Sequence, residues 1–526
     1  MGNSLTRRTV LFAAAAGVAL PGVAAADPLP VFGHGVASGD PFPDSVLLWT
    51  RVTPTSDALP GSGVGPSVDV RWEVASDASF ADVVSCGVAR TSASRDHTVK
   101  VIAEGLSPSA AYYYRFLCGG QTSPVGRTRT APAHNASLAS LRFGVVSCAN
   151  WAVGHFAPYR YLASRDDLDA VIHLGDYIYE GSPSPGDLRV VVPPHELETL
   201  ADYRQRHASY KTDPHVQAVH ARHPMIATWD DHEAADNAWS GGSPSHDPAT
   251  EGPWAVRMAA AHQAYFEWMP VRVHGTRLYR RLRFGTLADL TMMDLRSYRT
   301  QQPAPGAEDP AGTILGATQR AWVVDGIARG KPAWNLFGNS VMFSPLKVPV
   351  LPPAHATVVS RMLADQPQAT TVNTDQWDGY AADRRVLVDA IRAQGRSNSV
   401  FLTGDIHSTW ALNVPSDPAD PLSPPVAAEF VTTSITSDNF DELLHVPPRT
   451  ASLAVEAAFR ALNPHVQWVE LDSHGPSVLE VTPSTVQMDW YYVANRADPA
   501  TSLSLGASFL THLGDPHVVA APKPIG

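Results

Sequence analysis

Polar side chains that can hold metals or phosphoryl groups follow several apolar runs in this chain. After the run at residues 400–403 come Gly404, Asp405 and His407, although aspartate and histidine enter a core only with partners. One such residue alone could be a turn or helix-cap residue. Five other apolar runs end in the same way, which makes coincidence a poor explanation. The polar segments after them are residues 148–150, 175–180, 230–233, 294–296 and 338–340.

The residue types in these segments indicate two metal sites of different chemistry. A phenolate from Tyr179, a thiolate from Cys148 and an imidazole from His407 would together favour iron over magnesium or calcium. The remaining groups are oxygen donors, which favour Ca²⁺ or Mg²⁺. They are Asp231, Asn339 and Asp405. A shared Asp176 could bridge two such metals about 3.5–4 Å apart, the arrangement used for displacement at phosphoesters.

Displacement at phosphorus also needs a cationic or hydrogen-bonding group opposite the metals. Arg296 is our first candidate because it follows a core strand. Arg204 is the second, although a surface position on a helix explains that arginine at least as well. Asn150 is a further candidate donor.

The elements that must position these groups are strands alternating with helices after residue 140. The strand candidates are continuous apolar runs, which indicates a sheet buried on both faces. They lie at residues 141–147, 170–174, 225–229, 287–293, 334–337 and 400–403. In open α/β sheets, ligands gather beyond the carboxyl ends of the strands. The sequence therefore predicts one α/β domain over residues 135–526, with the polar segments at one edge.

Residues 27–134 show a different pattern of short alternating runs separated by Pro, Gly and Ser. This spacing is typical of a small antiparallel β-sandwich. The phrase at residues 105–108 (GLSP) resembles a fibronectin-type-III corner. Two of the three cysteines, Cys86 and Cys118, lie in this stretch and could form a disulfide in an oxidising compartment. Cys148 is then either a buried small hydrophobe or a metal ligand.

The first 26 residues are predicted to be an export signal. Arg7 and Arg8 precede an apolar run at residues 10–20, which is too short to span a membrane, and residues 24–26 give an A-x-A cleavage site. The paired arginines favour the twin-arginine route, with an ordinary secretory signal as the alternative. We therefore expect the mature protein to begin near Asp27 and to work outside the cytoplasm, secreted or on the cell-wall side.

Composition adds two limits. Hydrophobic residues make up 44% of the 526 residues, so a large core can form. The formal net charge is −12 with no basic run, which argues against a nucleic-acid-binding surface, although nucleic acid as a substrate stays open. We expect a monomer without a transmembrane segment.

Six motifs together resemble the alkaline phosphatase D (PhoD) family of the metallophosphoesterase superfamily. They are GDYIYEG, TWDDHEAADN, MDLRSYR, FGNSVMFS, QWDGY and FLTGDIHST. The resemblance covers essentially the whole chain, including the leader and the N-terminal β domain. It implies an α/β metallophosphoesterase sandwich and an Fe³⁺–Ca²⁺ centre with one or two calcium ions. The wider superfamily usually has other residues at Cys148, Asp231 and Asp405, which weakens an Fe–Zn or di-Mn assignment.

The resemblance also assigns roles to residues. The iron ligands it implies are Cys148, Asp176, Tyr179 and His407. The calcium ligands it implies are Asp176, Asp231, Asn339 and Asp405. His232 stands where related enzymes keep a histidine that contacts the phosphoryl group or protonates the leaving oxygen.

The predicted function is a secreted phosphoesterase that hydrolyses phosphomonoesters and phosphodiesters with a metal-activated hydroxide or oxide nucleophile. A phospholipase D-type phosphodiesterase of the same family is the alternative, since the metal ligands do not distinguish the two. Expected partners are small phosphoester or phospholipid substrates and the twin-arginine export machinery. A non-enzymatic binding module is the third hypothesis, and the complete ligand set argues against it.

Overall fold

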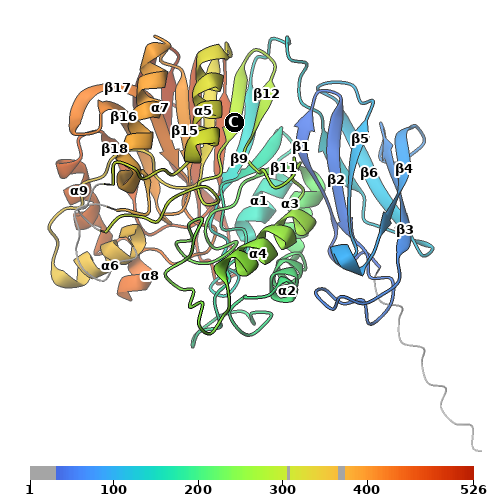
Figure 1. Ribbon diagram of the computed structural model, residues 1–526. Helices are drawn as coiled ribbons and strands as arrows, with labels where there is room; N and C mark the ends of the chain where they lie inside the picture. The colour runs from blue at the N-terminus through green and yellow to red at the C-terminus, as the bar shows by residue number, and fades with distance from the viewer. Residues whose placement is uncertain (1–30, 305–308, 365–372) are drawn as a thin grey trace, which may run out of the picture.

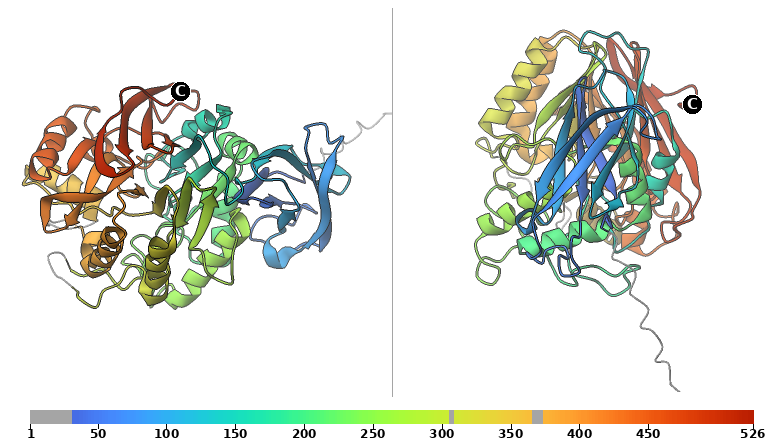
Figure 2. Two further views of the ribbon diagram at one scale, coloured as in Figure 1. Left: turned by 90° about the horizontal axis from the view of Figure 1, so that it is seen from above. Right: turned by 90° about the vertical axis from the view of Figure 1, so that its right-hand side faces the viewer.

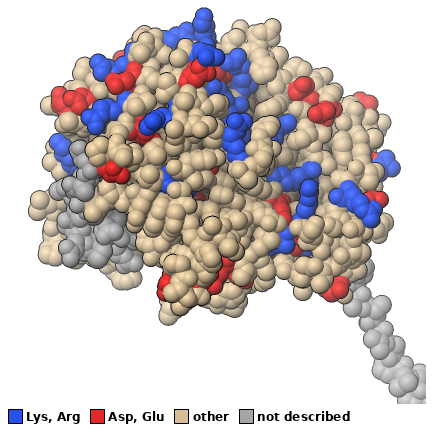
Figure 3. All heavy atoms as spheres, in the orientation of Figure 1, with Lys and Arg blue, Asp and Glu red and all other residues tan. Residues whose placement is uncertain are grey.

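The computed structural model describes residues 31–304, 309–364 and 373–526. The predicted export signal, residues 1–26, lies outside the described residues. A β-rich N-terminal part lies beside a larger part in which strands are covered by helices (Figure 1). None of the helices in the described ranges is both long and apolar enough to cross a membrane. On the face shown in Figure 3, basic and acidic side chains are interspersed among neutral ones.

The larger part contains two sheets, and the first has ten strands. Its central strands β9, β10, β11 and β1 run parallel, and each of the outer strands is antiparallel to its neighbour. In spatial order the strands are β22 (Asp515–Ala520), β21 (Leu503–His512), β20 (Thr485–Val493), β19 (Ser477–Val481), β9 (Leu141–Val146), β10 (Ala170–His173), β11 (Pro224–Ala227), β1 (Val36–Phe42), β2 (Ser45–Arg51) and β5 (Thr98–Glu104).

The second sheet has seven strands, of which β13, β14, β15 and β17 are parallel. In spatial order they are β12 (Arg280–Phe284), β13 (Ala288–Met292), β14 (Trp334–Asn339), β15 (Ser399–Thr403), β17 (Asp420–Val431), β16 (Thr409–Asp417) and β18 (Val466–Glu470). The predicted α/β class with parallel core strands is confirmed.

The two sheets pack face to face, because their continuous apolar strands bury side chains on both surfaces. Phe143 of the first sheet meets Phe284 of the second edge to face, with ring centroids 5.2 Å apart. One group of helices covers the outer face of the first sheet: α1 (Ala157–Ser164), α2 (Leu200–Tyr210), α3 (Pro214–Arg222) and α4 (Trp254–Trp268). On the outer face of the second sheet lie α5 (Gly316–Arg329) and α7 (Ala381–Ala393), as the views of Figure 2 show.

Three further helices, α6 (Pro353–Ala364), α8 (Phe440–Leu444) and α9 (Ser452–Leu462), lie at the far end of the second sheet. Helix α7 shows why these segments are helical. Its buried residues Leu387, Val388 and Ile391 recur at helical spacing, so one face packs on the sheet. Helix α2 is preceded by the N-cap residue Thr199, whose side chain forms a capping box with Asp202.

The N-terminal β domain has a second sheet of its own and shares the first. Its own strands are β4 (Val83–Thr91), β3 (Val68–Ala75), β6 (Ala111–Cys118), β7 (Gln121–Thr122) and β8 (Gly126–Arg129). The facing layer is β1, β2 and β5, which continue the ten-stranded sheet because Ser38 and Gly39 pair with β11. A Cβ at Gly39 would lie 1.8 Å from the carbonyl oxygen of Pro270, so this close approach requires glycine. The fibronectin-type-III likeness stays a prediction.

The disulfide between Cys86 and Cys118 that the sequence leaves possible does not form in this structure. Cys86 lies on β4 opposite Glu73 of β3, and Cys118 lies on β6, on the other side of β3. Two strand spacings of about 4.8 Å each exceed the roughly 7 Å limit between bridged Cα atoms. All three cysteines are free thiols, and Cys148 is the buried one.

Candidate metal centre

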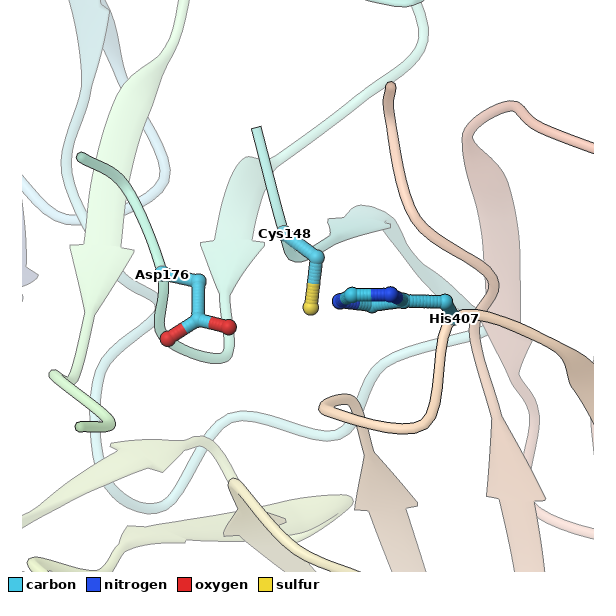
Figure 4. A group of neighbouring side chains, drawn as sticks. All are labelled: Cys148, Asp176 and His407. Carbon is cyan, nitrogen blue, oxygen red and sulfur yellow. The ribbon is translucent and has the colours of Figure 1, made fainter. Parts of the chain in front are cut away.

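Four ligand-type side chains from strand ends far apart in the sequence converge on one point. The ligand atoms of Cys148, Asp176 and His407 all lie within 4.8 Å of one another. Figure 4 shows the Cys148 sulfur between the Asp176 carboxylate and the His407 ring. The phenol oxygen of Tyr179 lies 3.2 Å from Oδ2 of Asp176 and 3.2 Å from Nε2 of His407. These residues follow β9, β10 and β15, and at the same edge a bridge joins Ser147, after β9 of the first sheet, to Ser434, after β17 of the second.

Two further groups of donors adjoin this one. Asp176, Asp231 and His232 form the second group, and Asp230, Asp231 and Asp405 form the third. Asp176 therefore belongs to the first and second groups, and Asp231 belongs to the second and third. The arrangement is one sulfur-, phenol- and imidazole-containing pocket next to an oxygen-rich pocket, with a carboxylate between them.

The backbone at this edge adopts a conformation that side chains rarely allow. Cys148, Asp176, Asp405 and His407 all have positive φ, between 51° and 69°. Gly175 has φ 116°, and a Cβ there would lie 2.5 Å from Cβ of Asp230. Left-handed residues that carry side chains are sparse and cost on the order of 1–3 kcal/mol each. Their concentration here indicates that the sharp turns serve to aim the ligand-type side chains.

The protonation behaviour of the group fits a metal site. Burial raises the pKa of Asp176 and Asp405 well above the usual range, and neighbouring aspartates raise both further. Burial and the Asp176 charge do the same for the Cys148 thiol and the Tyr179 phenol. Oδ1 of Asp176 is buried without a hydrogen-bond partner among the described residues. A bound cation would satisfy that oxygen and favour all four charged forms, so these residues fit a metal pair.

The segment at residues 432–442 orients two of the ligand-type side chains. Nδ1 of His407 lies 3.0 Å from the carbonyl oxygen of Asp438. A proton on Nδ1 leaves Nε2 free to accept, and burial lowers the His407 pKa to about 4, so the imidazole is neutral. The Ser437 hydroxyl lies 2.6 Å from the Tyr179 oxygen.

His232 lies beside the oxygen-rich pocket, in contact with a buried carboxylate. Its Nδ1 lies 2.7 Å from the buried carboxylate of Glu180, and its ring stacks on Tyr179 with centroids 4.1 Å apart. Burial by itself lowers the pKa of His232, but the carboxylates of Glu180, Asp231 and Asp176 raise it well above its usual range. The Glu180 contact therefore favours the protonated form of the His232 imidazole.

A cavity of about 770 Å³ opens beside the two pockets. Tyr179 and His232 form part of its wall, and Asn150 lies in the same wall. The structure therefore places Asn150 beside the predicted centre, where its side chain also accepts from the backbone N–H of Ala152 at 3.0 Å.

Asn339, which we expected to bind calcium, is used elsewhere. Its Nδ2 donates to Val341 and to the Thr403 hydroxyl, and its Oδ1 accepts from Trp377 at 2.8 Å. The side chain is fully buried, and both of its polar atoms have partners within the protein. In this structure the residue ties β14 to β15, and calcium binding by Asn339 stays a prediction. The strand-end pattern could not reveal this, because the partner Trp377 lies in a distant motif.

Arg296, our first candidate for a phosphate clamp, does not reach the cavity. Its guanidinium is 2% exposed and forms two-point ion pairs with Asp230 and Asp375, at 2.7–2.9 Å. It lies 3.8 Å from Asp231 and 4.0 Å from Asp405. Arg296 is therefore a fixed countercharge behind the oxygen-rich pocket, which corrects the prediction of a clamp.

Arg204, the second candidate, is also placed away from the centre. It pairs with Glu267 through two bonds of 2.7 Å and donates to the Ser94 carbonyl of the N-terminal domain.

Sequence reasoning missed Arg206, two residues later on α2. Its buried guanidinium donates to the carbonyl of Tyr179 and to four carbonyls of residues 180–196, which we call the cavity-wall loop because several of its residues line the cavity. The four residues are Gly181, Val192, Pro193 and His195. A buried arginine whose partners are backbone carbonyls leaves no sequence pattern.

Comparison with known proteins supports one family over nearly the whole chain. The family model of the PhoD-like phosphatase matches residues 143–490, and the model of the PhoD-like phosphatase N-terminal domain matches residues 17–132. Alkaline phosphatase D of Bacillus subtilis (strain 168) is 36% identical over 499 residues, which cover 91% of this chain and 80% of that protein. The solved structure of PhoD superimposes with a TM-score of 0.83 at 33% identity, covering 95% of this chain and 94% of the other. This protein is a phosphoesterase hydrolase, and the chain belongs to the PhoD-like phosphatase family.

Proposed function

We propose that this protein is an exported, metal-dependent phosphatase that hydrolyses phosphomonoesters and phosphodiesters. The observation that carries the proposal is the position of Asp176, which belongs to both a sulfur-, phenol- and imidazole-containing group and an oxygen-rich group. Two dissimilar ion sites that share one carboxylate suit the clamping of a phosphoryl group.

The donor chemistry favours Fe³⁺ for the first group and Ca²⁺ for the second. Cys148, Tyr179 and His407 would hold the iron together with Asp176. Asp231 and Asp405 would hold calcium, one ion or two, with Asp176 shared. When bound, the metals would supply Lewis acidity toward the phosphoryl group.

The protein's own groups would complete the reaction. His232, protonated and aimed by Glu180, is placed to give its proton to the leaving oxygen. Bound cations would neutralise Asp176 and Asp231, so these two carboxylates would raise the pKa of His232 less. The contact with Glu180 would then be the one that keeps the imidazole charged. Asn150 would donate to a phosphoryl oxygen from the cavity wall.

Export supports the choice of compartment. The paired Arg7 and Arg8 before a short apolar run favour the twin-arginine route, which carries folded proteins. A buried centre built from strand ends 259 positions apart, from Cys148 to His407, would have to form before export by that route. We propose a monomer that acts outside the cytoplasm.

Metal analysis of the purified protein combined with a substrate panel tests the proposal. We expect about one iron per chain together with calcium, and hydrolysis of p-nitrophenyl phosphate and bis-p-nitrophenyl phosphate. Choline release from phosphatidylcholine that exceeds both would favour the phospholipase D-type alternative. An iron-free protein with full activity would refute the iron assignment, and export abolished by Arg7→Lys/Arg8→Lys would support the twin-arginine route.

A further inference from the structure

An arginine far from every motif is attached to the segment that orients the metal ligands. Arg496 lies in the connection between β20 and β21. Its Nη1 donates to the carbonyl of Thr436, and its Nη2 lies 2.6 Å from Oδ1 of Asp438. Its Nε lies 3.4 Å from a carboxylate oxygen of Glu442. All three guanidinium nitrogens are therefore directed at residues 436–442.

The backbone of Arg496 is fixed as well. Its carbonyl oxygen accepts from the N–H of His155 at 2.8 Å, next to Gly154. A Cβ at Gly154 would lie 2.6 Å from the Thr436 side chain, so the three segments are in close contact. Arg496 thus joins three segments. They are the hairpin of β20 and β21, which we call the C-terminal hairpin, the loop after β9, and residues 436–442.

The residues that Arg496 holds are those that touch the ligand-type side chains. Asp438 uses its side chain for Arg496 and its carbonyl for Nδ1 of His407, at 3.0 Å. Ser437, between Thr436 and Asp438, contacts the Tyr179 oxygen at 2.6 Å and the Cys148 carbonyl at 3.1 Å. A movement of residues 436–442 would therefore change two contacts together. One is the contact between the Asp438 carbonyl and Nδ1 of His407, which sets the tautomer of that imidazole, and the other is the contact between Ser437 and Tyr179.

The same segment has further anchors: the Thr436 hydroxyl donates to the Asn150 carbonyl at 2.7 Å, and another set of contacts lies on the inner side of the segment. The Ser434 hydroxyl lies 2.9 Å from His474, whose other nitrogen lies 3.0 Å from Glu442. Ser434 and His474 are buried, Glu442 is half-buried, and together they fix the two ends of residues 434–442. The middle, at Thr436 and Asp438, is fixed from the cavity side by Arg496, whose side chain is 15% exposed.

We propose that Arg496 is a positioning residue that holds residues 436–442 and thereby fixes Tyr179 and His407 for metal binding. Arg496 acts through Ser437 and Asp438, because each of its three nitrogens lies against residues 436–442. The proposal rests on the metal-dependent function proposed above. It assigns a role in that function to the C-terminal hairpin, which the strand-end motifs do not include.

Metal retention tests this role directly. Arg496→Met is compared with Arg496→Lys and with Arg160→Met, since Arg160 donates to the Thr501 carbonyl in the same connection without touching residues 436–442. We expect Arg496→Met to lower iron retention during dialysis against a chelator roughly 10–100-fold, the usual effect of losing a partner of a metal ligand. Arg496→Lys should recover part of it and Arg160→Met should match wild type. With p-nitrophenyl phosphate, kcat should fall while KM changes less than about threefold.

A second measurement is independent of both metal and activity. In a Cys86→Ser/Cys118→Ser background stripped of metal, a thiol reagent reports access to Cys148, whose carbonyl contacts Ser437. We expect labelling at least about 10-fold faster with Arg496→Met and with Asp438→Asn, which breaks the same ion pair while keeping Arg496. Unchanged labelling together with unchanged metal retention would overturn the inference. So would a raised KM with full metal content, because that result would make Arg496 a substrate contact.

These results separate the inference from the proposed function. If the protein proved to hydrolyse no phosphoester, retention and labelling would still report on Arg496. If the protein hydrolysed phosphoesters with Arg496→Met behaving as wild type in every measurement, only the inference would fail.

Discussion

The phenol oxygen of Tyr179 lies 3.2 Å from Nε2 of His407, although 228 positions separate the two residues in the sequence. Tyr179 follows a strand of the first sheet, and His407 follows a strand of the second. Their contact therefore depends on the register in which the two sheets pack. Residues 437–438 contact both side chains, since Ser437 lies against the Tyr179 oxygen and the Asp438 carbonyl lies against Nδ1 of His407.

Replacing Tyr179 with Phe keeps the ring and removes only the oxygen. We expect Tyr179→Phe to lose iron and the visible absorption that phenolate-to-iron charge transfer would give. The kcat should fall by roughly 100-fold or more, since even partners of ligands are worth about 10–100-fold. Absorption spectra and metal analysis of the purified variant measure this. A variant that keeps iron, colour and rate would remove Tyr179 from the ligand set.

His232→Asn tests the proton donor through its dependence on the leaving group. General acid catalysis contributes roughly 10²–10⁴-fold, and an alkyl alkoxide needs it more than p-nitrophenolate does. We therefore expect kcat to fall by about that factor with an alkyl phosphate and by clearly less with p-nitrophenyl phosphate. Glu180→Gln should show the same order of effects in weaker form, because it leaves the imidazole but removes its partner at 2.7 Å. Equal losses on both substrates would contradict the assignment.

Arg296 and Arg204 give a matched pair of buried arginines with different neighbours. Removing one partner of a buried ion pair typically costs about 3–5 kcal/mol, so both Met variants should lower the free energy of unfolding. Only Arg296→Met should also weaken calcium binding, because Arg296 lies 3.8–4.0 Å from Asp231 and Asp405. Urea unfolding and calcium titration of both variants measure the difference. If Arg296→Met had normal stability and a raised KM, that result would support Arg296 as a group that binds the phosphoryl group of the substrate.

The sequence predicted the positions of the strand ends well, because each core strand is an apolar run that stops at a polar segment. The same pattern could not distinguish Asn339, which faces into the second sheet, from Asp405, which faces the centre. Arg204 and Arg206 lie on the same helix two residues apart, and only tertiary packing decides which one faces the cavity-wall loop. Arg496 lies outside every motif, since its role comes from carbonyls and an aspartate supplied by another segment.

Lys100, on β5, predicts how stability changes with pH away from the metal centre. Its Nζ donates to the Phe266 carbonyl at 2.7 Å. Burial lowers its pKa to about 7, and the charges of Asp40 and Glu267 offset only part of this shift. An unfolded lysine titrates near 10.4, so between about pH 7 and 10 the unfolded chain binds more protons than the folded one.

The free energy of unfolding should therefore rise with pH across that window, by up to about 1.4 kcal/mol per pH unit from this one group. Lys100→Met should be more stable than wild type at pH 7 and should show a smaller rise toward pH 9.5. Urea unfolding at pH 7, 8 and 9.5 measures both slopes, with exposed Lys331→Met as the control. Parallel slopes for wild type and Lys100→Met would mean that the folded protein keeps the Lys100 ammonium charged throughout.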